Sequence, residues 1–274
     1  MNSGARERFA ELVRSPSRIR NLAEAALLVA AEEKPDVNVD RYLGQLGLLA
    51  EEARPQVGCS DSELGRIEAL NRFLYVEKGF RGSRRPTHDP RNSLLDEVLD
   101  RRTGLPITLA IVYMDVAVRL GLDVRGVSFP AHFLCKHVGR DEIIIDPLTG
   151  EVLRREDCRV RLHEALGCEA DLEESLRPAE PREIVARLLR NLKHVYFRQG
   201  RFENALACSD RILILTPDRA LEIRDRGVLY QKLECFGAAL ADLERFLELA
   251  PHDPSAGPVR RGITDLRRRA AQIH

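Results

Sequence analysis

Residues 101–122 read RRTGLPITLAIVYMDVAVRLGL, and this stretch decides the fold. Gly104 is well placed to end a short preceding helix. Pro106 suits the first turn of a new helix, because its missing N–H would have no partner there. From Ile107 to about Leu120 the sequence is apolar on nearly every face. A helix that is hydrophobic all round belongs in the middle of a domain, so we expect the chain to fold around it.

The sequence on either side of this stretch has other periodicities. Up to about residue 77, apolar residues recur every three and four positions, which predicts helices. Residues 79–90 are polar and without a period, which indicates a loop, and Asn92 or Ser93 is expected to cap the short helix that follows. After the central helix the period becomes that of strands. The expected strands are Val124–Phe129, His132–Val138 and Glu142–Asp146. This order of elements is typical of an α+β fold.

A second region begins after residues 176–181, whose sequence LRPAEP is typical of a domain boundary. Two segments beyond it align at a period of 34 residues and match the pattern of a tetratricopeptide repeat. The matching residues are Leu189, Leu192, Tyr196, Gly200, Phe202, Ala205 and Pro217 in the first segment, and Ile223, Gly227, Tyr230, Phe236, Ala239 and Pro251 in the second. A basic helix over residues 259–273 would cap the stack. The sequence therefore predicts two domains, residues 1–177 and residues 182–274.

The composition argues against several functional classes. Forty-three basic residues balance forty-three acidic ones, so no global field would attract nucleic acid or an anionic membrane. The six cysteines are Cys59, Cys135, Cys158, Cys168, Cys208 and Cys235. They include no C-x-x-C pair and no histidine spacing typical of zinc, so we expect no metal and no cofactor. No apolar stretch is long enough for a membrane span or a signal sequence, and reduced thiols fit a cytoplasmic protein.

Two of the expected strands carry a candidate catalytic pair. If their hairpin turns at Gly139, His132 and Asp146 lie opposite each other on one face, with Cβ atoms about 5 Å apart. An aspartate in that place would orient the imidazole and stabilise its charged form. Such a pair should have a partner at a helix N-terminus, where backbone N–H groups favour a developing anion. The alternative is a structural pair that only ties two strands together.

The motifs in this part of the chain resemble the core of transglutaminase-like proteins. They include Asn92-Ser93, Arg102-Thr103-Gly104-Leu105-Pro106-Ile107, Phe129-Pro130-Ala131-His132-Phe133-Leu134 and Ile145-Asp146-Pro147. The similarity covers roughly residues 20–265 and is most specific to the SirB-type branch, a bacterial group in which this domain precedes tetratricopeptide repeats. The resemblance implies a papain-like fold, and it implies that Cys, His and Asp side chains carry out acyl transfer at amide bonds.

Carried over by position, His132 matches the family histidine and Asp146 the family aspartate, but the nucleophile is missing. The superfamily cysteine stands two residues after the first glycine and fifteen before the glycine that follows the central helix, and both counts give Pro106 here. A proline ring has no nucleophilic atom. Thr108 is the best substitute hydroxyl, with hydrogen bonding inside the first helical turn as the alternative. Cys135 is excluded, because three residues along a strand place it on the face opposite His132.

A polar stripe on the first repeat helix is a candidate peptide-binding site. Its members are Arg187, Arg190, Asn191, His194 and Arg198. In a repeat protein such a stripe can line a groove that accepts an acidic peptide or a C-terminal carboxylate. A solvated helix face is the alternative, and Leu221 and Asp225 in the second repeat depart from a known carboxylate-binding pattern.

These observations favour a non-catalytic interaction or regulatory protein. In this hypothesis a transglutaminase-like domain without its nucleophile is joined to repeats that bind a protein or peptide. One alternative is a hydrolase or acyltransferase acting on amide bonds with a displaced nucleophile, in which His132 is the base and Asp146 orients it. The other is a protein whose repeats carry the whole function, with the N-terminal domain as a cap or regulator.

Overall fold

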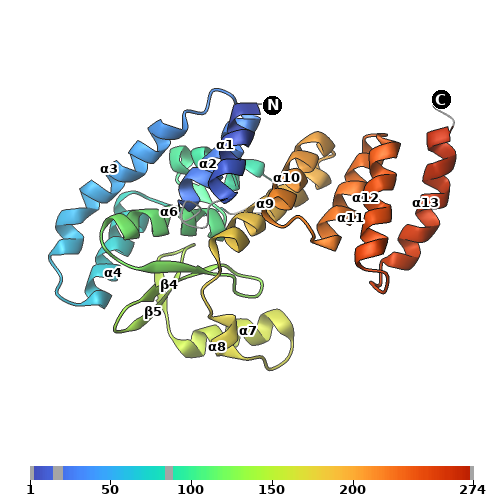
Figure 1. Ribbon diagram of the computed structural model, residues 1–274. Coiled ribbons are helices and arrows are strands. Elements are labelled where there is room, and N and C mark those ends of the chain that lie inside the picture. Colours follow the sequence, from blue (N-terminus) through green and yellow to red (C-terminus); the bar gives the residue numbers. More distant parts are fainter. Residues whose placement is uncertain (1–2, 15–20, 84–88, 272–274) are drawn as a thin grey trace. The chain divides into compact units, whose positions relative to one another are not determined.

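The computed structural model describes residues 3–14, 21–83 and 89–271. The chain divides into two units after Leu188, so that helix α9 begins in the first unit and ends in the second. The first unit is an α+β domain and the second consists of helices only, as the sequence predicted (Figure 1). Among the described residues, no helix combines the length and the hydropathy that crossing a membrane requires.

The first unit has helices before, between and after its strands along the chain. They are α1 (Ser3–Arg14), α2 (Leu22–Glu33), α3 (Val39–Gly58), α4 (Glu63–Asn71), α5 (Leu95–Arg101), α6 (Pro106–Arg119), α7 (Arg155–Leu166) and α8 (Leu172–Ser175). A π-helical segment, η1 (Arg72–Glu77), continues α4, and a 3-10 turn, η2 (Pro90–Asn92), precedes α5. The strands are β1 (Arg81–Gly82), β2 (Thr103–Gly104), β3 (Val124–Val127), β4 (Leu134–Val138), β5 (Glu142–Asp146) and β6 (Glu151–Leu153).

Helix α6 is the central helix that the sequence predicted. Pro106 occupies its first turn, and Gly121 follows its end with a φ of 75°. Every side chain from Ile107 to Met114 is buried. Because fully burying one aliphatic side chain contributes about 1.5–3 kcal/mol, this helix supplies much of the driving force for folding the first unit.

The helix before α6 ends differently from the prediction. The left-handed residue at its C-terminus is Arg102, with a φ of 53°, and not Gly104. Gly104 lies in β2, where an added Cβ would stand 2.6 Å from the Oγ1 atom of Thr108. The glycine is therefore needed for the close approach of β2 to α6, and the glycine pattern alone could not distinguish this role from a helix cap.

The main sheet is antiparallel, with strand order β3-β4-β5-β6, and a small parallel pair of β1 and β2 was not predicted. Helix α6 lies on one side of the sheet, and α7 and α8 lie on the other (Figure 1). The core between the sheet and α7 and α8 consists of Val127, Phe129, Leu134, Ile144, Leu153, Cys158, Leu162, Leu172 and Leu176. Since side chains alternate along a strand, the neighbours of these residues point towards α6.

The hairpin between β4 and β5 has its turn centred one residue later than the sequence suggested. Its register pairs Cys135 with Ile145, which centres the turn on Arg140 and not on the preceding glycine. The backbone N–H of Asp141, in this turn, donates to Glu63 Oε2 of α4 at 3.2 Å. The observed strand register thus occurs together with a contact to α4, which is far away in the sequence. A preference for glycine in the turn could not predict that contact.

The second unit contains two helical repeats and a final helix, as predicted. Its helices are α9 (Pro181–Arg198, from Leu189 onwards), α10 (Phe202–Leu215), α11 (Ala220–Lys232), α12 (Phe236–Leu249) and α13 (Ala256–Ala271). Ala205 and Ala239, the small residues of the repeat pattern, are fully buried. Leu243 of α12 packs with Ile263 and Leu266 of α13, so the last helix covers the apolar face of the second repeat.

An ion cluster replaces an apolar contact in the second repeat. Arg226 stands immediately before Gly227, where the repeat pattern has leucine. Its guanidinium donates to both carboxylate oxygens of Asp242, at 2.7 and 2.8 Å, and to Asp210 at 3.2 Å. Asp242 is only 8% exposed, so this bidentate pair lies mostly inside the helix stack.

Candidate functional site

The first turn of α6 carries Pro106, the position that the sequence resemblance assigns to the family nucleophile. Pro106 is its first residue, and the preceding Leu105 provides no side-chain cap. Thr108 is fully buried, and its hydroxyl lies 2.8 Å from the carbonyl oxygen of Asn92 and 3.0 Å from that of Leu105. The bond to Leu105 is the hydrogen bond inside the first helical turn that was considered as the alternative role of Thr108, and the bond to Asn92 reaches a segment 16 residues away.

Asn92 joins the chain segments around the start of α6. The sequence predicted that Asn92 or Ser93 would cap α5, and neither does. The N-cap of α5 is a leucine without a capping bond. The carbonyl of Asn92 accepts the backbone N–H of Leu105 at 3.1 Å. Its side-chain amide donates to Ser83 at 3.0 Å, and its side-chain oxygen accepts from Arg101 at 3.3 Å. With 1% exposure, Asn92 is a buried structural linker at this site.

His132 lies in the loop before β4, and not inside the strand as predicted. In this loop Ala131 has a left-handed backbone with a φ of 56°, and the His132 N–H donates to the Phe129 carbonyl at 3.1 Å. Arg187 donates to the carbonyls of both Phe129 and His132, at 3.3 and 2.5 Å. Arg187, predicted to bind a peptide, thus holds the histidine loop. The half-buried imidazole itself makes no hydrogen bond to any residue that the structure describes.

Asp146 is the last residue of β5, and its carboxylate is already bound. Arg161 of α7 donates to Oδ2 at 2.7 Å, and the backbone N–H of Leu148 donates to Oδ1 at 2.9 Å. The observed register places Leu134, and not His132, in line with Asp146, so the predicted cross-strand pair is wrong. Asp146 shares the face of β5 that packs against α7, on the side of the sheet opposite α6.

Cys135 is not an alternative nucleophile. Its side chain is fully buried on the α6 side of the sheet, and burial, together with the Asp146 carboxylate, raises the pKa of the Cys135 thiol well above its ordinary value. Burial, with a smaller contribution from Cys135, also raises the pKa of Tyr113 in α6. Because the thiolate is the reactive form, burial and the raised pKa disfavour Cys135 as a nucleophile.

Sequence reasoning missed a second carboxylate and imidazole pair. His137 of β4 is 4% exposed, its Nδ1 lies 3.1 Å from the Asp123 carbonyl, and its Nε2 lies 3.4 Å from Glu63 Oε2. The Asp141 N–H and, to a smaller extent, His137 lower the pKa of Glu63. This pair ties the β4-β5 hairpin to the start of α4, and no local motif signals it because its members lie far apart in sequence.

The Glu63 contacts predict a pH-dependent contribution to stability. A carboxylate whose pKa is lowered in the folded state stabilises it above the unfolded pKa, and this stabilisation is lost as the pH falls through the folded pKa. We therefore expect Glu63→Gln to lower the Tm at pH 7, and the difference from the wild type to disappear only as the pH falls through the folded pKa of Glu63, below the ordinary glutamate value of about 4.3. Thermal unfolding followed by circular dichroism between pH 3 and about pH 7 tests this. Glu68→Gln, an exposed position on the same helix, should have no effect at any pH.

The members of the predicted stripe that lie in the second unit differ in their contacts. Arg190 lies 4.0 Å from Glu222 of α11. Asn191 is half-buried, and His194 and Arg198 are exposed. The stripe therefore extends along one face of α9 as predicted, but part of its positive charge is compensated by the second repeat.

Lys193, which the sequence did not single out, provides the main ionic link between α9 and α11. Its Nζ atom lies 2.6 Å from Glu222 and 2.9 Å from Asp225. Glu222 is only 4% exposed, so its carboxylate is paired as a buried charge must be. The period of 34 aligns Asp225 with Asn191, but it carries no information on which side chain of α9 would meet it.

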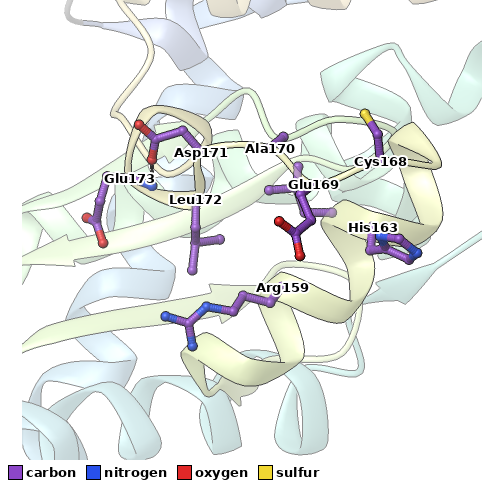
Figure 2. Close-up of a pocket in the computed structure, with 9 residues that line it drawn as sticks. Arg159, His163, Cys168, Glu169, Ala170, Asp171, Leu172 and Glu173 are labelled. Carbon is purple, nitrogen blue, oxygen red and sulfur yellow. Dashed lines mark hydrogen bonds between the residues drawn. The ribbon is translucent and has the colours of Figure 1, made fainter.

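A hollow of about 500 Å³ lies beside α7 and α8. Figure 2 shows His163 on α7 and Cys168 after it, with the carboxylates of Glu169, Asp171 and Glu173 further along the rim. The Asp171 carboxylate caps α8 by accepting the Glu173 N–H at 2.8 Å. The hollow contains none of the predicted site residues. In the described ranges, no three His, Cys, Asp or Glu side chains converge as metal ligands would.

Comparison with known proteins agrees with both units. Residues 40–190 match the family model of the transglutaminase-like superfamily, and residues 192–264 match that of the tetratricopeptide repeat. A UPF0162 protein of Xylella fastidiosa is 39% identical over 259 residues, which cover 92% of each chain. A UPF0162 protein of Vibrio cholerae is 34% identical over 86% of this chain and 88% of its own length.

Protein SirB1 of Salmonella typhimurium is 32% identical over 85% of this chain and 86% of its own length. The solved structure of menin aligns with 88% of this chain and 69% of the menin chain at a TM-score of 0.40 and 10% sequence identity, a likeness too weak to extend to function. The family match and the relatives cover most of the sequence, including the first turn of α6 and both repeats. This chain therefore belongs to the transglutaminase-like superfamily and, within it, to the family that contains SirB1 and the UPF0162 proteins.

Proposed function

We propose that this chain is a non-catalytic interaction protein, in which a transglutaminase-like domain serves as a scaffold and the tetratricopeptide repeats bind a segment of another protein. The observation that carries the proposal is the first turn of α6. Pro106, the position that the resemblance assigns to the nucleophile, begins this helix, and the nearby hydroxyl of Thr108 donates to two backbone carbonyls. The proline ring has no nucleophilic atom, and the Thr108 oxygen is fully buried, so a substrate carbonyl would have no access to it.

The surroundings of His132 and Asp146, which match the family histidine and aspartate by position, support the same proposal. An orienting carboxylate must accept a hydrogen bond from the imidazole that it serves. Asp146 instead accepts from Arg161 and from a backbone N–H, and it belongs to the face of the sheet that packs against α7. The backbone of His132 is fixed by Arg187, but its imidazole has no carboxylate partner among the described residues. A base without an orienting group and without a nucleophile is poorly equipped for acyl transfer.

The repeats supply the binding half of the proposal. Stacked helical repeats present extended faces on which protein segments bind, and they act through surface contacts without chemistry. The match to the tetratricopeptide pattern covers residues 192–264, and the face of α9 retains exposed polar and aromatic side chains. A scaffold that keeps a fold while losing a nucleophile fits this use.

Incubation of the full chain with a panel of amide and thioester substrates tests the catalytic half. We expect no turnover above a heat-denatured control. Because exposed cysteines react with acyl-transferring probes without catalysis, we expect equal labelling of the wild type and His132→Ala in mass spectrometry. Turnover by the wild type that disappears in His132→Ala, with the fold of the variant checked by circular dichroism, would overturn the proposal. That result would instead support a hydrolase or acyltransferase with a displaced nucleophile.

A further inference from the structure

Equivalent positions of the two repeats lie along one face of α9 and one face of α11, and ion pairs link these two helices. In each helix the stripe follows the spacing of three and four residues that keeps side chains on one side. The equivalent pairs, 34 residues apart, are Arg190 and Arg224, Asn191 and Asp225, His194 and Val228, Phe197 and Gln231, and Arg198 and Lys232. We call these ten residues the α9–α11 face. Four of them are Arg or Lys and one is Asp, so the face carries an excess of positive charge that the whole chain lacks.

The N-terminal end of the α9–α11 face is neutralised by the protein itself. Lys193, beside the face, binds Glu222 and Asp225, and Arg190 lies 4.0 Å from Glu222. Arg224 donates to Asp225 at 2.7 Å. These charges hold α9 and α11 together, and they are not available to a ligand without breaking buried or half-buried pairs.

The C-terminal end of the same face is different. Arg198 and Lys232, at equivalent positions, are exposed, and no carboxylate within the described ranges pairs with either of them. His194, one turn before Arg198, is also exposed. Phe197 is 39% exposed, and its ring is fixed edge to face against Phe202 with the centroids 5.6 Å apart. A rigid exposed aromatic ring beside arginine is the composition that dominates binding energy in protein interfaces.

We propose that the C-terminal end of the α9–α11 face binds an acidic protein segment that also carries an apolar side chain. The inference rests on the proposed function and names its partner by chemistry. Carboxylates of the segment would neutralise Arg198 and Lys232, and its apolar side chain would cover Phe197. A nucleic acid fits less well, because the N-terminal end of the face is neutralised by its own ion pairs and leaves only a short basic site for a long phosphate backbone.

A phage-displayed library of random peptides, panned on the full chain, tests this partner. We expect the retained peptides to be enriched in Asp and Glu next to an aromatic or aliphatic residue. A labelled retained peptide should bind the double variant Arg198→Glu, Lys232→Glu at least tenfold more weakly in fluorescence anisotropy, and Phe197→Ser should also weaken it. Affinity should fall as the salt concentration rises, since exposed charges are screened.

The double variant Arg261→Glu, Arg269→Glu on α13 is the matched control. It makes the same change in net charge at two exposed basic residues. One of them, Arg269, lies in the last turn of its helix, as Arg198 and Lys232 do. An equal loss of affinity in the control would overturn the inference, because it would show a response to net charge alone. Retained peptides without acidic residues would overturn the inference but leave the proposed function standing. Failure to retain any peptide would count against both. The Tm of each variant separates lost binding from a weakened helix end.

Discussion

Replacing Arg226 by alanine is expected to destabilise the repeat unit by about 2–4 kcal/mol. The guanidinium of Arg226 binds both oxygens of Asp242 and one of Asp210, and its removal leaves the Asp242 carboxylate, which is 8% exposed, without its cation. An uncompensated buried charge is more costly than the net value of the pair that it came from, so the loss should exceed that of an ordinary surface ion pair. Urea denaturation followed by circular dichroism measures the change.

Two further variants show whether burial of the charge is the cause. The double substitution Arg226→Leu, Asp242→Leu restores leucine to the repeat pattern and removes both charges, so it should recover most of the lost stability. Arg245→Ala on α12 breaks an exposed pair with Glu248 and should change the stability by less than about 0.5 kcal/mol. Equal effects of Arg226→Ala and Arg245→Ala would contradict this account.

Removing Arg161 should destabilise the first unit by a similar amount, about 2–4 kcal/mol. The Arg161 guanidinium lies 2.7 Å from Asp146 Oδ2, and the Asp146 side chain is only 8% exposed. In Arg161→Ala the carboxylate would keep the Leu148 N–H as its only partner among the described residues. The loss of this pair would also free α7 from the end of β5. Chemical denaturation at neutral pH measures the effect.

The test of Arg161 has a close control on the same helix. Arg159 is exposed and lies 3.4 Å from Glu156, so Arg159→Ala should change the stability by less than about 0.5 kcal/mol. Adding Asp146→Asn to Arg161→Ala removes the buried charge and should recover part of the loss. If Arg161→Ala proved as mild as Arg159→Ala, the Asp146 carboxylate would not depend on this arginine.

The fold was predictable where a pattern repeats along the chain. Helix α6 follows from an apolar run bounded by Pro106 and Gly121, and the helices of the second unit follow from a period of 34 residues. Both signals depend only on residues near each other in sequence. The α+β class of the first unit follows from the change of period after α6.

The candidate site was less predictable, because contacts between distant segments decide it. Asp141 in the hairpin turn binds Glu63 of helix α4. The turn is centred one residue later than glycine preference suggests. Arg161 binds Asp146 only because α7 packs across the sheet. Neither contact has a local signature, so His132 and Asp146 were paired by a register that the folded chain does not adopt.

The position of Asp146 limits how catalysis could be engineered into this scaffold. A cysteine placed at position 106 would stand in the first turn of α6, on the side of the sheet away from the carboxylate that Arg161 holds. A single substitution at position 106 would therefore not give the new thiol a histidine base that an aspartate orients. Activity would require at least that the arginine be removed and the histidine loop be released from Arg187 as well. Engineering this activity would thus need several simultaneous substitutions, and removing Arg161 or Arg187 would also weaken the fold.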